Sequence, residues 1–454
     1  KSSRGLGDVY KRQFVKYPIM SEEITGFSKL SKDEKIEWLT KTCFQDSDSA
    51  KNVLTQYWNS DSKLQKLHDE FSENTISNYY LPFAIAPNFL INEKIYSVPM
   101  TIEESSVVAA ASKAAKFWMK HGGFKAEVIN EEKIGQVHFI FHGDKKIISE
   151  YFDFVKPILF KNSKVLTKKM ESRGGGINDI KLIDKTSDLS GYYQLFSTFN
   201  TVDAMGANFI NSCLEDFSKT FCNSIAKFNR KELKEKDVEI IMSILSNYVP
   251  NCIVKSSLSC SVSELNKLEP ETKNFASRFV KAVEIANNDI HRAVTHNKGI
   301  MNGVDAVAIA TGNDFRAIEA AAHAYASIGK YKSLSNAFIE NEIFYFELKL
   351  PLAIGTVGGV TNLHPLVKLA LNMLENPNTK ELMNIIASVG LAQNFGALRS
   401  LVTSGIQKGH MKMHLTNLLN KHKASENEKE QALVYFKDKL VSSSSVENFI
   451  KNIR

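Results

Sequence analysis

The feature that most constrains the fold is an alanine-rich stretch between Glu104 and Lys120. Its small residues favour a helix, and they leave room for other backbones to approach closely. A helix of this kind belongs in the interior of a protein. We therefore expect a large domain built around a buried helix at this position.

The patterns on either side predict a mixed α+β protein. Residues 20–70 have helical spacing, with Ser31-Lys-Asp-Glu34 as a capping box, whereas Tyr79–Met100 is rich in aromatic and β-branched residues, which is typical of strands. Between Gly122 and about Asn200, strand-like runs alternate with one helical stretch, Lys146–Lys161. This change predicts a small α/β domain inserted into the larger one.

The second half of the chain is expected to alternate between helices and strands. Helices are predicted at Ala204–Ile225 and Glu232–Ser246, and alternating elements then follow to about Leu398. The last segment, Thr403–Arg454, has the pattern of a Lys-rich helical region. Its serine run, Ser442–Ser445, is the composition of a mobile loop.

Composition favours a globular cytoplasmic protein. Hydrophobic residues make up 43% and charged residues 24% of the chain, which argues against broad disorder. Apolar runs such as Ala306–Ala310 are far shorter than the roughly 18 residues that span a bilayer, so no membrane contact is expected. The five cysteines form no C-x-x-C pair, which predicts reduced thiols and no zinc site.

The net charge of +7 does not indicate a nucleic-acid partner. Residues 1–19 contribute +4 of it, and without them the net charge is +3. Lys1–Gln13 has no periodicity, so we interpret residues 1–19 as a leader that is non-native or disordered. Basic and aromatic residues are not interleaved elsewhere, and no nucleic-acid groove is predicted.

Taken singly, the candidate motifs all have ordinary interpretations. The glycine turns Gly174–Asp179 and Gly355–Gly359 match neither a dinucleotide fingerprint nor a phosphate loop. His410 and His414 have metal-ligand spacing, but Met411 stands where a zincin has glutamate, so no metal is predicted. The remaining motifs contain single acids and lysines that are common at helix ends and turns.

Taken together, the motifs resemble those of the HMG-CoA (3-hydroxy-3-methylglutaryl-coenzyme A) reductases. The resemblance covers about Leu30 to Lys423, and the form without an anchor is similar to the class II, mainly prokaryotic, branch. In chain order the motifs are Glu103-Glu-x-Ser-x-Val-Ala-Ala-Ala, Asp203-Ala-Met-Gly-Ala-Asn208, His296-Asn-Lys-Gly-Ile-Met-Asn-Gly303, Thr311-Gly-Asn-Asp314, Gly355-Thr-Val-Gly-Gly359, Val389-Gly-Leu-Ala-Gln-Asn394 and Gly405-Ile-Gln-Lys-Gly-His-Met411.

The resemblance implies a role for individual residues. The implied catalytic groups are Glu104, Lys298, Asp314 and His410. The implied substrate contacts are Ser106, Arg292, Asn302 and Gln393. The implied cofactor contacts are Asp203, Ala204, Met205, Gly206 and Asn208.

The implied reaction reduces (S)-HMG-CoA to mevalonate and free coenzyme A with two NAD(P)H, or runs in reverse. Lys298 can stabilise the oxyanion of each reduction, and Asp314 can keep that lysine charged. His410 can protonate the departing thiolate, since an imidazole titrates near neutral pH. Glu104, if burial keeps it protonated, can protonate the aldehyde oxygen, and Arg292 can bind the terminal carboxylate.

The resemblance also implies an architecture. A large domain around the buried helix carries a ferredoxin-like cofactor domain and a helical C-terminal flap, and the active site lies between subunits of a homodimer or larger homo-oligomer. The expected ranges are 1–19 for the leader, 20–121 and 223–398 for the large domain, 122–222 for the NAD(P)-binding insert and 399–454 for the flap with the catalytic histidine.

NADPH is the expected cofactor. In the NADH-preferring members of the branch an acid stands shortly before the triple-glycine turn, where it accepts hydrogen bonds from the ribose hydroxyls. Here Thr167 occupies the matching position, with Lys164, Lys168 and Lys169 nearby. Glu171 remains an alternative acid.

Two rivals and one departure from the family pattern stay open. A non-catalytic homologue that binds coenzyme A or a nucleotide is the main rival, but all four ionisable groups are present. A Ser/His hydrolase lacks its Gly-x-Ser-x-Gly elbow. The departure lies in Glu73-Asn-Thr-Ile-Ser77, where the family has glycine in place of Ser77; a positive φ there would cost about 1 kcal/mol.

Overall fold

The structure is a computed structural model that describes residues 23–230, 232–403, 405, 415–437, 439 and 441–454. By internal contacts the chain divides into two compact units, residues 1–82 and 83–454. The predicted leader and His410 lie outside the described residues.

The first unit contains three short helices. They are α2 (Lys32–Cys43), α3 (Ser47–Gln56) and α4 (Ser62–Asp69), preceded by the single turn η1 (Phe27–Lys29). The predicted capping box at the start of α2 is confirmed, because Ser31 and Glu34 each bond the other's backbone N–H.

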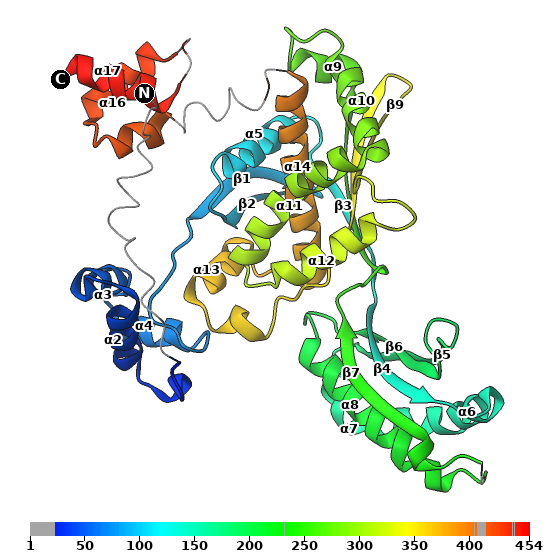
Figure 1. Cartoon of the computed structure of the whole chain (residues 1–454). Helices are drawn as coiled ribbons and strands as arrows, with labels where there is room; N and C mark the ends of the chain where they lie inside the picture. The colour runs from blue at the N-terminus through cyan, green and yellow to red at the C-terminus, as the bar shows by residue number, and fades with distance from the viewer. Residues whose placement is uncertain (1–22, 231, 404, 406–414, 438, 440) are drawn as a thin grey trace, which may run out of the picture. The chain divides into compact units, whose positions relative to one another are not determined.

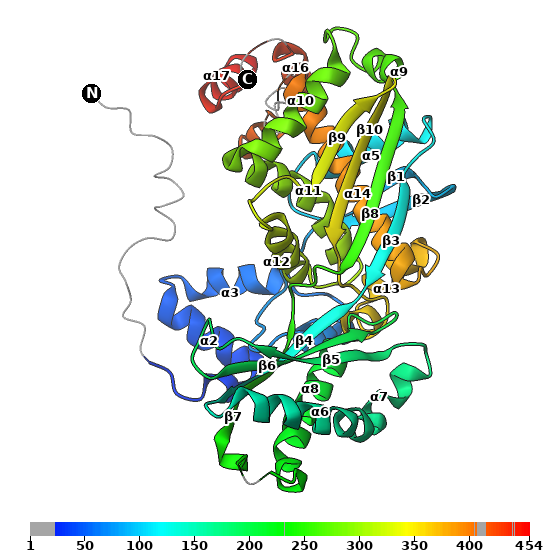
Figure 2. The same cartoon turned by 90° about the vertical axis from the view of Figure 1, so that its right-hand side faces the viewer.

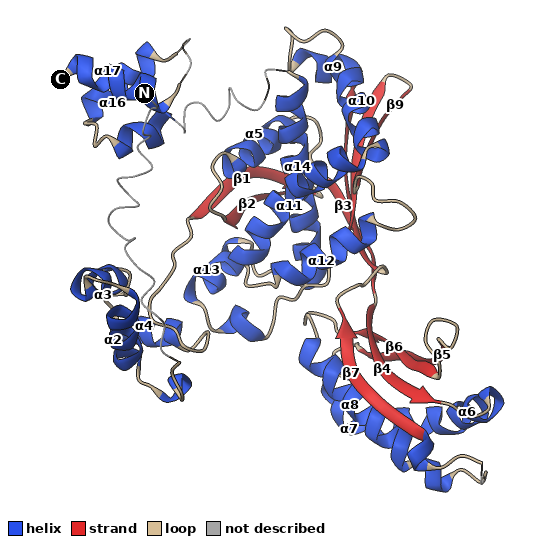
Figure 3. Ribbon diagram, viewed as in Figure 1, coloured by secondary structure: helices blue, strands red, loops and turns tan. Residues whose placement is uncertain are grey.

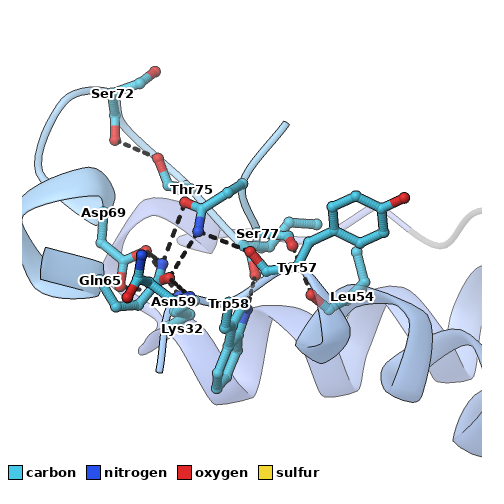
Figure 4. Close-up of polar contacts among 12 residues, drawn as sticks. Lys32, Leu54, Tyr57, Trp58, Asn59, Gln65, Asp69, Ser72, Thr75 and Ser77 are labelled. Atoms are coloured by element: carbon cyan, nitrogen blue, oxygen red, sulfur yellow. Dashed lines mark hydrogen bonds and ion pairs between the residues drawn. The ribbon is translucent and has the colours of Figure 1, made fainter. Parts of the chain in front are cut away.

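Ser77 fits this unit without strain. It is not among the residues with positive φ, so the expected cost does not arise. Its hydroxyl donates a hydrogen bond of 2.6 Å to the Leu54 carbonyl, and the Trp58 indole donates one of 2.9 Å to the Ile76 carbonyl (Figure 4). The serine thus ties the end of the unit to α3 through its side chain, which glycine cannot do.

The second unit contains a large-sheet region and a small-sheet region (Figures 1 and 3). The large-sheet region has the antiparallel sheet β3-β8-β10-β9 and the separate hairpin β1-β2. Its elements are β1 (Phe83–Ile91), β2 (Lys94–Thr101), α5 (Val107–Met119), β3 (Lys125–Glu131), β8 (Cys252–Ser261), α9 (Val262–Lys267), α10 (Phe275–Asn288), α11 (Ile290–Ala310), α12 (Phe315–Ala326), β9 (Ser335–Glu340), β10 (Ile343–Pro351), η4 (Gly359–Asn362), α13 (Pro365–Met373) and α14 (Thr379–Val402).

The small-sheet region, residues 133–246, has the strand order β5-β6-β4-β7, with its helices on one face (Figure 2). Its elements are β4 (Lys133–Phe141), α6 (Lys145–Asn162), α7 (Lys164–Glu171), β5 (Gly176–Asp184), β6 (Tyr192–Asn200), α8 (Ala207–Asn223), η2 (Ile225–Lys227), η3 (Glu235–Asp237) and β7 (Val238–Ser246). The chain order of strands and helices is that of a split β-α-β unit.

Two sequence predictions need correction here. Residues 232–246 were predicted to be helical, but Val238–Ser246 is the edge strand β7, paired with β4. The predicted limits of the insert, residues 122 and 222, also differ from the limits of the small-sheet region, residues 133 and 246. Strand β3 pairs with β8 in the large sheet, whereas β7 completes the small one.

Among the described helices α14 is the most enclosed, and the alanine-rich helix that was predicted to be buried, α5, is less enclosed. Sixteen of the 24 residues of α14 are buried, compared with five of the 13 in α5. Among the described helices, only α14 has the length and apolar composition of a membrane span, and 67% of that window is buried in the protein. Burial of this extent is typical of a core helix.

The C-terminal residues form a small helical cluster. Residues 415–421, α16 (Glu426–Tyr435) and α17 (Ser443–Ile453) share a core that includes Leu419, Phe436 and Val446. The serine run predicted to be a loop instead starts α17, where Ser442 is the N-cap and forms a capping box with Ser445. The predicted start of the flap at residue 399 also lies inside α14, which ends at Val402.

Candidate active site

A pocket of about 250 Å³ lies between the start of α5 and the helices α11 and α14. Six of the eight predicted catalytic and substrate residues line it: Glu104, Ser106, Arg292, Lys298, Asn302 and Gln393. We call it the α5–α11–α14 pocket. Residues from three distant parts of the sequence therefore meet at one place.

Helical periodicity explains the α11 side of the pocket. Arg292, His296, Gly299 and Asn302 follow one another at intervals of four, three and three residues, which places them on one face of the helix. On the opposite side, Ser106 is the N-cap of α5 with φ +76°, an unusual conformation for serine. Strain of this kind is common where a backbone must present groups to a ligand.

The two predicted catalytic groups of the pocket contact each other. Lys298 Nζ lies 2.6 Å from Glu104 Oε2, and the two side chains are 57% and 38% exposed. A single chain therefore does not provide the burial that the hypothesis of a protonated Glu104 requires. It does place an ammonium and a carboxylate within reach of one reacting oxygen.

Arg292 supplies a second cation. Partial burial lowers the pKa of its guanidinium, but an arginine keeps its charge in proteins. Among the described residues no side chain pairs with this guanidinium. A half-buried, unpaired guanidinium is a suitable partner for a carboxylate ligand.

His296 was not assigned a role from the sequence, although it belongs to the same motif as Lys298. Its Nε2 lies 2.7 Å from the Ser335 hydroxyl, which in turn donates to Asn394 Oδ1 at 2.8 Å. The Ser335 proton is thus already used, so His296 donates from Nε2–H. Burial lowers the pKa of His296 to about 3, with the nearby Arg292 charge adding to the effect, so the ring is neutral.

Asp314 does not join this pocket within one chain. It caps α12 by accepting hydrogen bonds from the N–H groups of Arg316 and Ala317, and its carboxylate pairs with the Arg316 side chain at 3.0 Å. Its hydrogen bond with Arg316 lowers the pKa of the Asp314 carboxyl. Lys298 lies 12 residues before Ala310, the last residue of α11, and so about 18 Å from the end of the helix that leads to Asp314.

A second candidate site surrounds the loop at residues 200–206, which contains the first four residues of the predicted cofactor motif; Asn208 follows in α8. The Asp203 carbonyl accepts a hydrogen bond of 2.9 Å from Thr356 N–H, and Asp203 Oδ1 accepts one of 3.0 Å from Thr379 N–H. Ala204 forms a bridge with Val357. The loop therefore contacts both the second glycine turn and the start of α14.

Close contacts explain one glycine in each turn. A Cβ on Gly355 would lie 2.4 Å from the Met205 backbone nitrogen. A Cβ on Gly175 would lie 2.6 Å from the Asn200 carbonyl oxygen and 2.9 Å from a Val202 methyl group. Three motifs that looked unrelated in the sequence are thus packed against one another.

The residues expected to select the cofactor lie in α7. Thr167 is 1% exposed, and its hydroxyl donates a hydrogen bond of 2.8 Å to Glu171 Oε1. The Glu171 carboxylate also pairs with Lys164 at 3.0 Å. The alternative acid is therefore present, but a lysine already neutralises it.

The described residues contain no group of three or more histidine, cysteine or acidic side chains arranged to hold a metal. The metal-like spacing of His410 and His414 falls outside them.

Residues 31–415 match the sequence model of hydroxymethylglutaryl-coenzyme A reductase. A 3-hydroxy-3-methylglutaryl-coenzyme A reductase of Archaeoglobus fulgidus is 35% identical over 405 residues, which are 88% of this chain and 87% of the relative. Two solved structures from Streptococcus pneumoniae are similar. One, a 3-hydroxy-3-methylglutaryl-coenzyme A reductase, has a TM-score of 0.69 and 34% identity over 95% of this chain and 99% of its own. The other, a class II reductase bound to NADPH in open conformations, has a TM-score of 0.68 and 35% identity over 84% of this chain and 99% of its own.

Proposed function

Because this chain belongs to the hydroxymethylglutaryl-coenzyme A reductase family, we propose that it reduces (S)-HMG-CoA to mevalonate and coenzyme A in two steps, using two NADPH. The observation that carries the proposal is the α5–α11–α14 pocket, where six of the expected residues meet. A non-catalytic homologue would have no need to keep Lys298 and Glu104 in contact.

Arg292 binds the terminal carboxylate of the substrate, since it is the unpaired cation of the pocket. Ser106, Asn302 and Gln393 line the same pocket and contact the acyl chain. Gln393 Oε1 is buried without a partner among the described residues, as expected of a group that a ligand satisfies.

Lys298 stabilises the negative charge that develops on the carbonyl oxygen in each reduction. Glu104, which touches the ammonium of Lys298, delivers the proton to the aldehyde oxygen in the second reduction. Between the two reductions the hemithioacetal breaks its carbon–sulfur bond, and His410 protonates the departing thiolate. His410 belongs to the proposed C-terminal flap, which covers bound substrate.

Asp314 acts from a second subunit. Within one chain α11 separates it from Lys298, so the same two residues can meet only if another copy brings its Asp314 to this pocket. The pocket opening then lies at a subunit interface, and closure by the partner supplies the burial that Glu104 lacks in one chain. A homodimer with two equivalent sites meets this requirement.

The loop at residues 200–206 and the two glycine turns fit a dinucleotide. Gly174 and Gly358 have positive φ and open space where a Cβ would stand, so phosphates can approach their backbone. The loop ends at Gly206, the N-cap of α8, whose first N–H groups favour an anion. When bound, NADPH supplies the hydride; Asp203, Ala204, Met205, Gly206 and Asn208 position it.

NADPH is preferred over NADH, because Lys164 neutralises Glu171 and no other acid of α7 stands near the triple-glycine turn. The protein acts in the cytoplasm, without a membrane, a nucleic acid or a metal.

The test follows NADPH absorbance with HMG-CoA as substrate. We expect two NADPH oxidised for each free thiol released, and a kcat/KM at least tenfold higher with NADPH than with NADH. Binding of HMG-CoA without turnover would instead support the non-catalytic homologue. A tenfold preference for NADH, about 1.4 kcal/mol, would reverse the cofactor assignment.

A further inference from the structure

The loop at residues 200–206 is held in a strained conformation. Val202 has φ +50°, in the left-handed region that a β-branched residue adopts rarely. Such a conformation persists only where the surroundings hold it from several sides. Its methyl group lies against Gly175, so the strain sits where two of the glycine-containing motifs meet.

A buried lysine at the start of β4 forms hydrogen bonds with this loop. Lys133 is 4% exposed, and its ammonium donates to the Thr201 hydroxyl at 2.5 Å and to the Ala204 carbonyl at 2.7 Å. The Thr201 hydroxyl donates to the same carbonyl at 2.6 Å. The two anchored residues lie on either side of Val202, so Lys133 spans the strained position.

Lys133 has no ion-pair partner within the described part of the chain. Two acids that act electrostatically on Lys133 have other partners: Glu131 pairs with Lys380 at 2.9 Å, and Asp203 accepts from Thr379. Burial lowers the pKa of Lys133. A lysine buried among neutral oxygens costs more free energy of folding than an apolar side chain in the same place. Its presence therefore indicates a role other than stability.

We propose that Lys133 is a positioning residue for the dinucleotide: it holds the loop at residues 200–206 in the strained form that receives the cofactor. This inference rests on the proposed assignment of that loop to the cofactor. Lys133 itself does not touch the reacting atoms. Its effect passes through the Ala204 carbonyl, in the second residue of the Asp203-Ala-Met-Gly motif.

The first test measures NADPH binding by fluorescence, without substrate. Lys133→Met keeps the length and packing of the side chain but removes both hydrogen bonds. We expect the Kd for NADPH to rise about tenfold, while the Kd for HMG-CoA in the absence of cofactor changes less than twofold. Lys255→Met is the matched control: it removes a lysine that pairs with Glu347 on the large sheet, and it should leave both constants unchanged.

A second test separates strain from general stability. In a Val202→Gly background the loop no longer needs to be forced into the left-handed region, so adding Lys133→Met should weaken NADPH binding less than threefold. A loss that stays tenfold overturns the proposal, because Lys133 would then act independently of the strain. Equal losses for NADPH and HMG-CoA overturn it too, since they indicate a merely structural role.

Thr201→Val provides a milder variant if Lys133→Met does not fold. It retains the shape of the side chain and removes one of the two acceptors of Lys133. We expect the Kd for NADPH to rise about threefold at an unchanged melting temperature, and no rise overturns the proposal. A wild-type protein that fails to bind NADPH would instead refute the proposed function.

Discussion

The α5–α11–α14 pocket and the loop at residues 200–206 present different parts of the chain. The pocket presents charged side chains from α11 and from the turn before α5, and its Lys298 and Glu104 are partly exposed. The loop presents main-chain atoms. It packs so closely against Gly355 and Gly175 that a Cβ added to either glycine would clash. Substitutions that change charge should therefore affect the pocket most, whereas one added methyl group is enough to disturb the packing of the loop.

The two regions are completed in different ways. The pocket does not include Asp314 within one chain, and in the proposed function a second copy supplies it. The loop is already fixed by contacts from β4, α14 and the second glycine turn of the same chain. We therefore expect catalysis to depend on assembly, and cofactor binding to depend on the integrity of the single chain.

The largest expected effect is at Lys298. Lys298→Ala should lower kcat by about 10²–10³ with HMG-CoA and with mevaldehyde alike, because both reductions place charge on the same oxygen. NADPH oxidation on the two substrates, with the Kd for NADPH as a control that should not change, checks this. A variant that reduces mevaldehyde at nearly the wild-type rate would show that Lys298 is not the oxyanion partner.

Mixing two inactive variants tests whether the pocket is shared. Lys298→Ala and Asp314→Asn should each be inactive alone. Unfolded together and refolded, they should recover about a quarter of wild-type activity, since half of the dimers are hybrids with one intact site of two. Recovery that requires joint refolding supports the shared pocket, whereas no recovery at any ratio means that both residues act within one chain.

A smaller effect is expected at Gly355. Gly355→Ala should destabilise the protein by about 1–3 kcal/mol and weaken NADPH binding, because the new methyl group meets the Met205 backbone rather than a flexible side chain. Gly299→Ala in α11 is the matched comparison: its Cβ would lie 3.9 Å from the Ala397 side chain, an ordinary contact. Thermal unfolding of the two variants should diverge; equal melting temperatures would mean that the loop yields easily.

The smallest effect concerns Asp305, which lies on α11 beyond the pocket. Burial, with Glu319 nearby, raises the pKa of Asp305 to about 8 from an ordinary 3.8. The folded chain keeps a proton that the unfolded chain loses, so stability is greatest below the ordinary pKa and falls as the pH rises to about 8. Asp305→Asn should remove this slope and raise the melting temperature by a few degrees at high pH only. A slope unchanged in the variant would show that another group titrates.

The sequence predicted most of the pocket because its residues lie in ordered motifs on regular helices. Helical periodicity alone predicts that Arg292 and Asn302 lie on one face of α11. The catalytic role of Asp314 stays a prediction; the structure places Asp314 at the N-cap of α12, beyond the end of α11, which the motif itself does not reveal. His410 stays a prediction, since the structure does not describe it.

Other features could not be predicted because they depend on pairing between distant segments. Strand β7 has isoleucines on both faces, with Ile241 and Ile244 largely exposed, so it lacks the alternation of a half-buried strand. Its conformation is fixed by the ladder with β4. The burial of Lys133 could not be predicted from the sequence either, because a lysine that starts a strand is expected to face solvent.

The inserted small-sheet region also has a consequence for how the chain folds. Glu131, the last residue of β3, pairs with Cys252, the first residue of β8, so the two ends of the insert lie side by side. Forming that pair early would require closing a loop of about 120 residues, with a large entropic cost. If the insert folds first, it brings its own ends together, and the large sheet then closes over a short effective loop. The connectivity therefore favours an order of folding in which the insert forms first and its two flanks assemble on it.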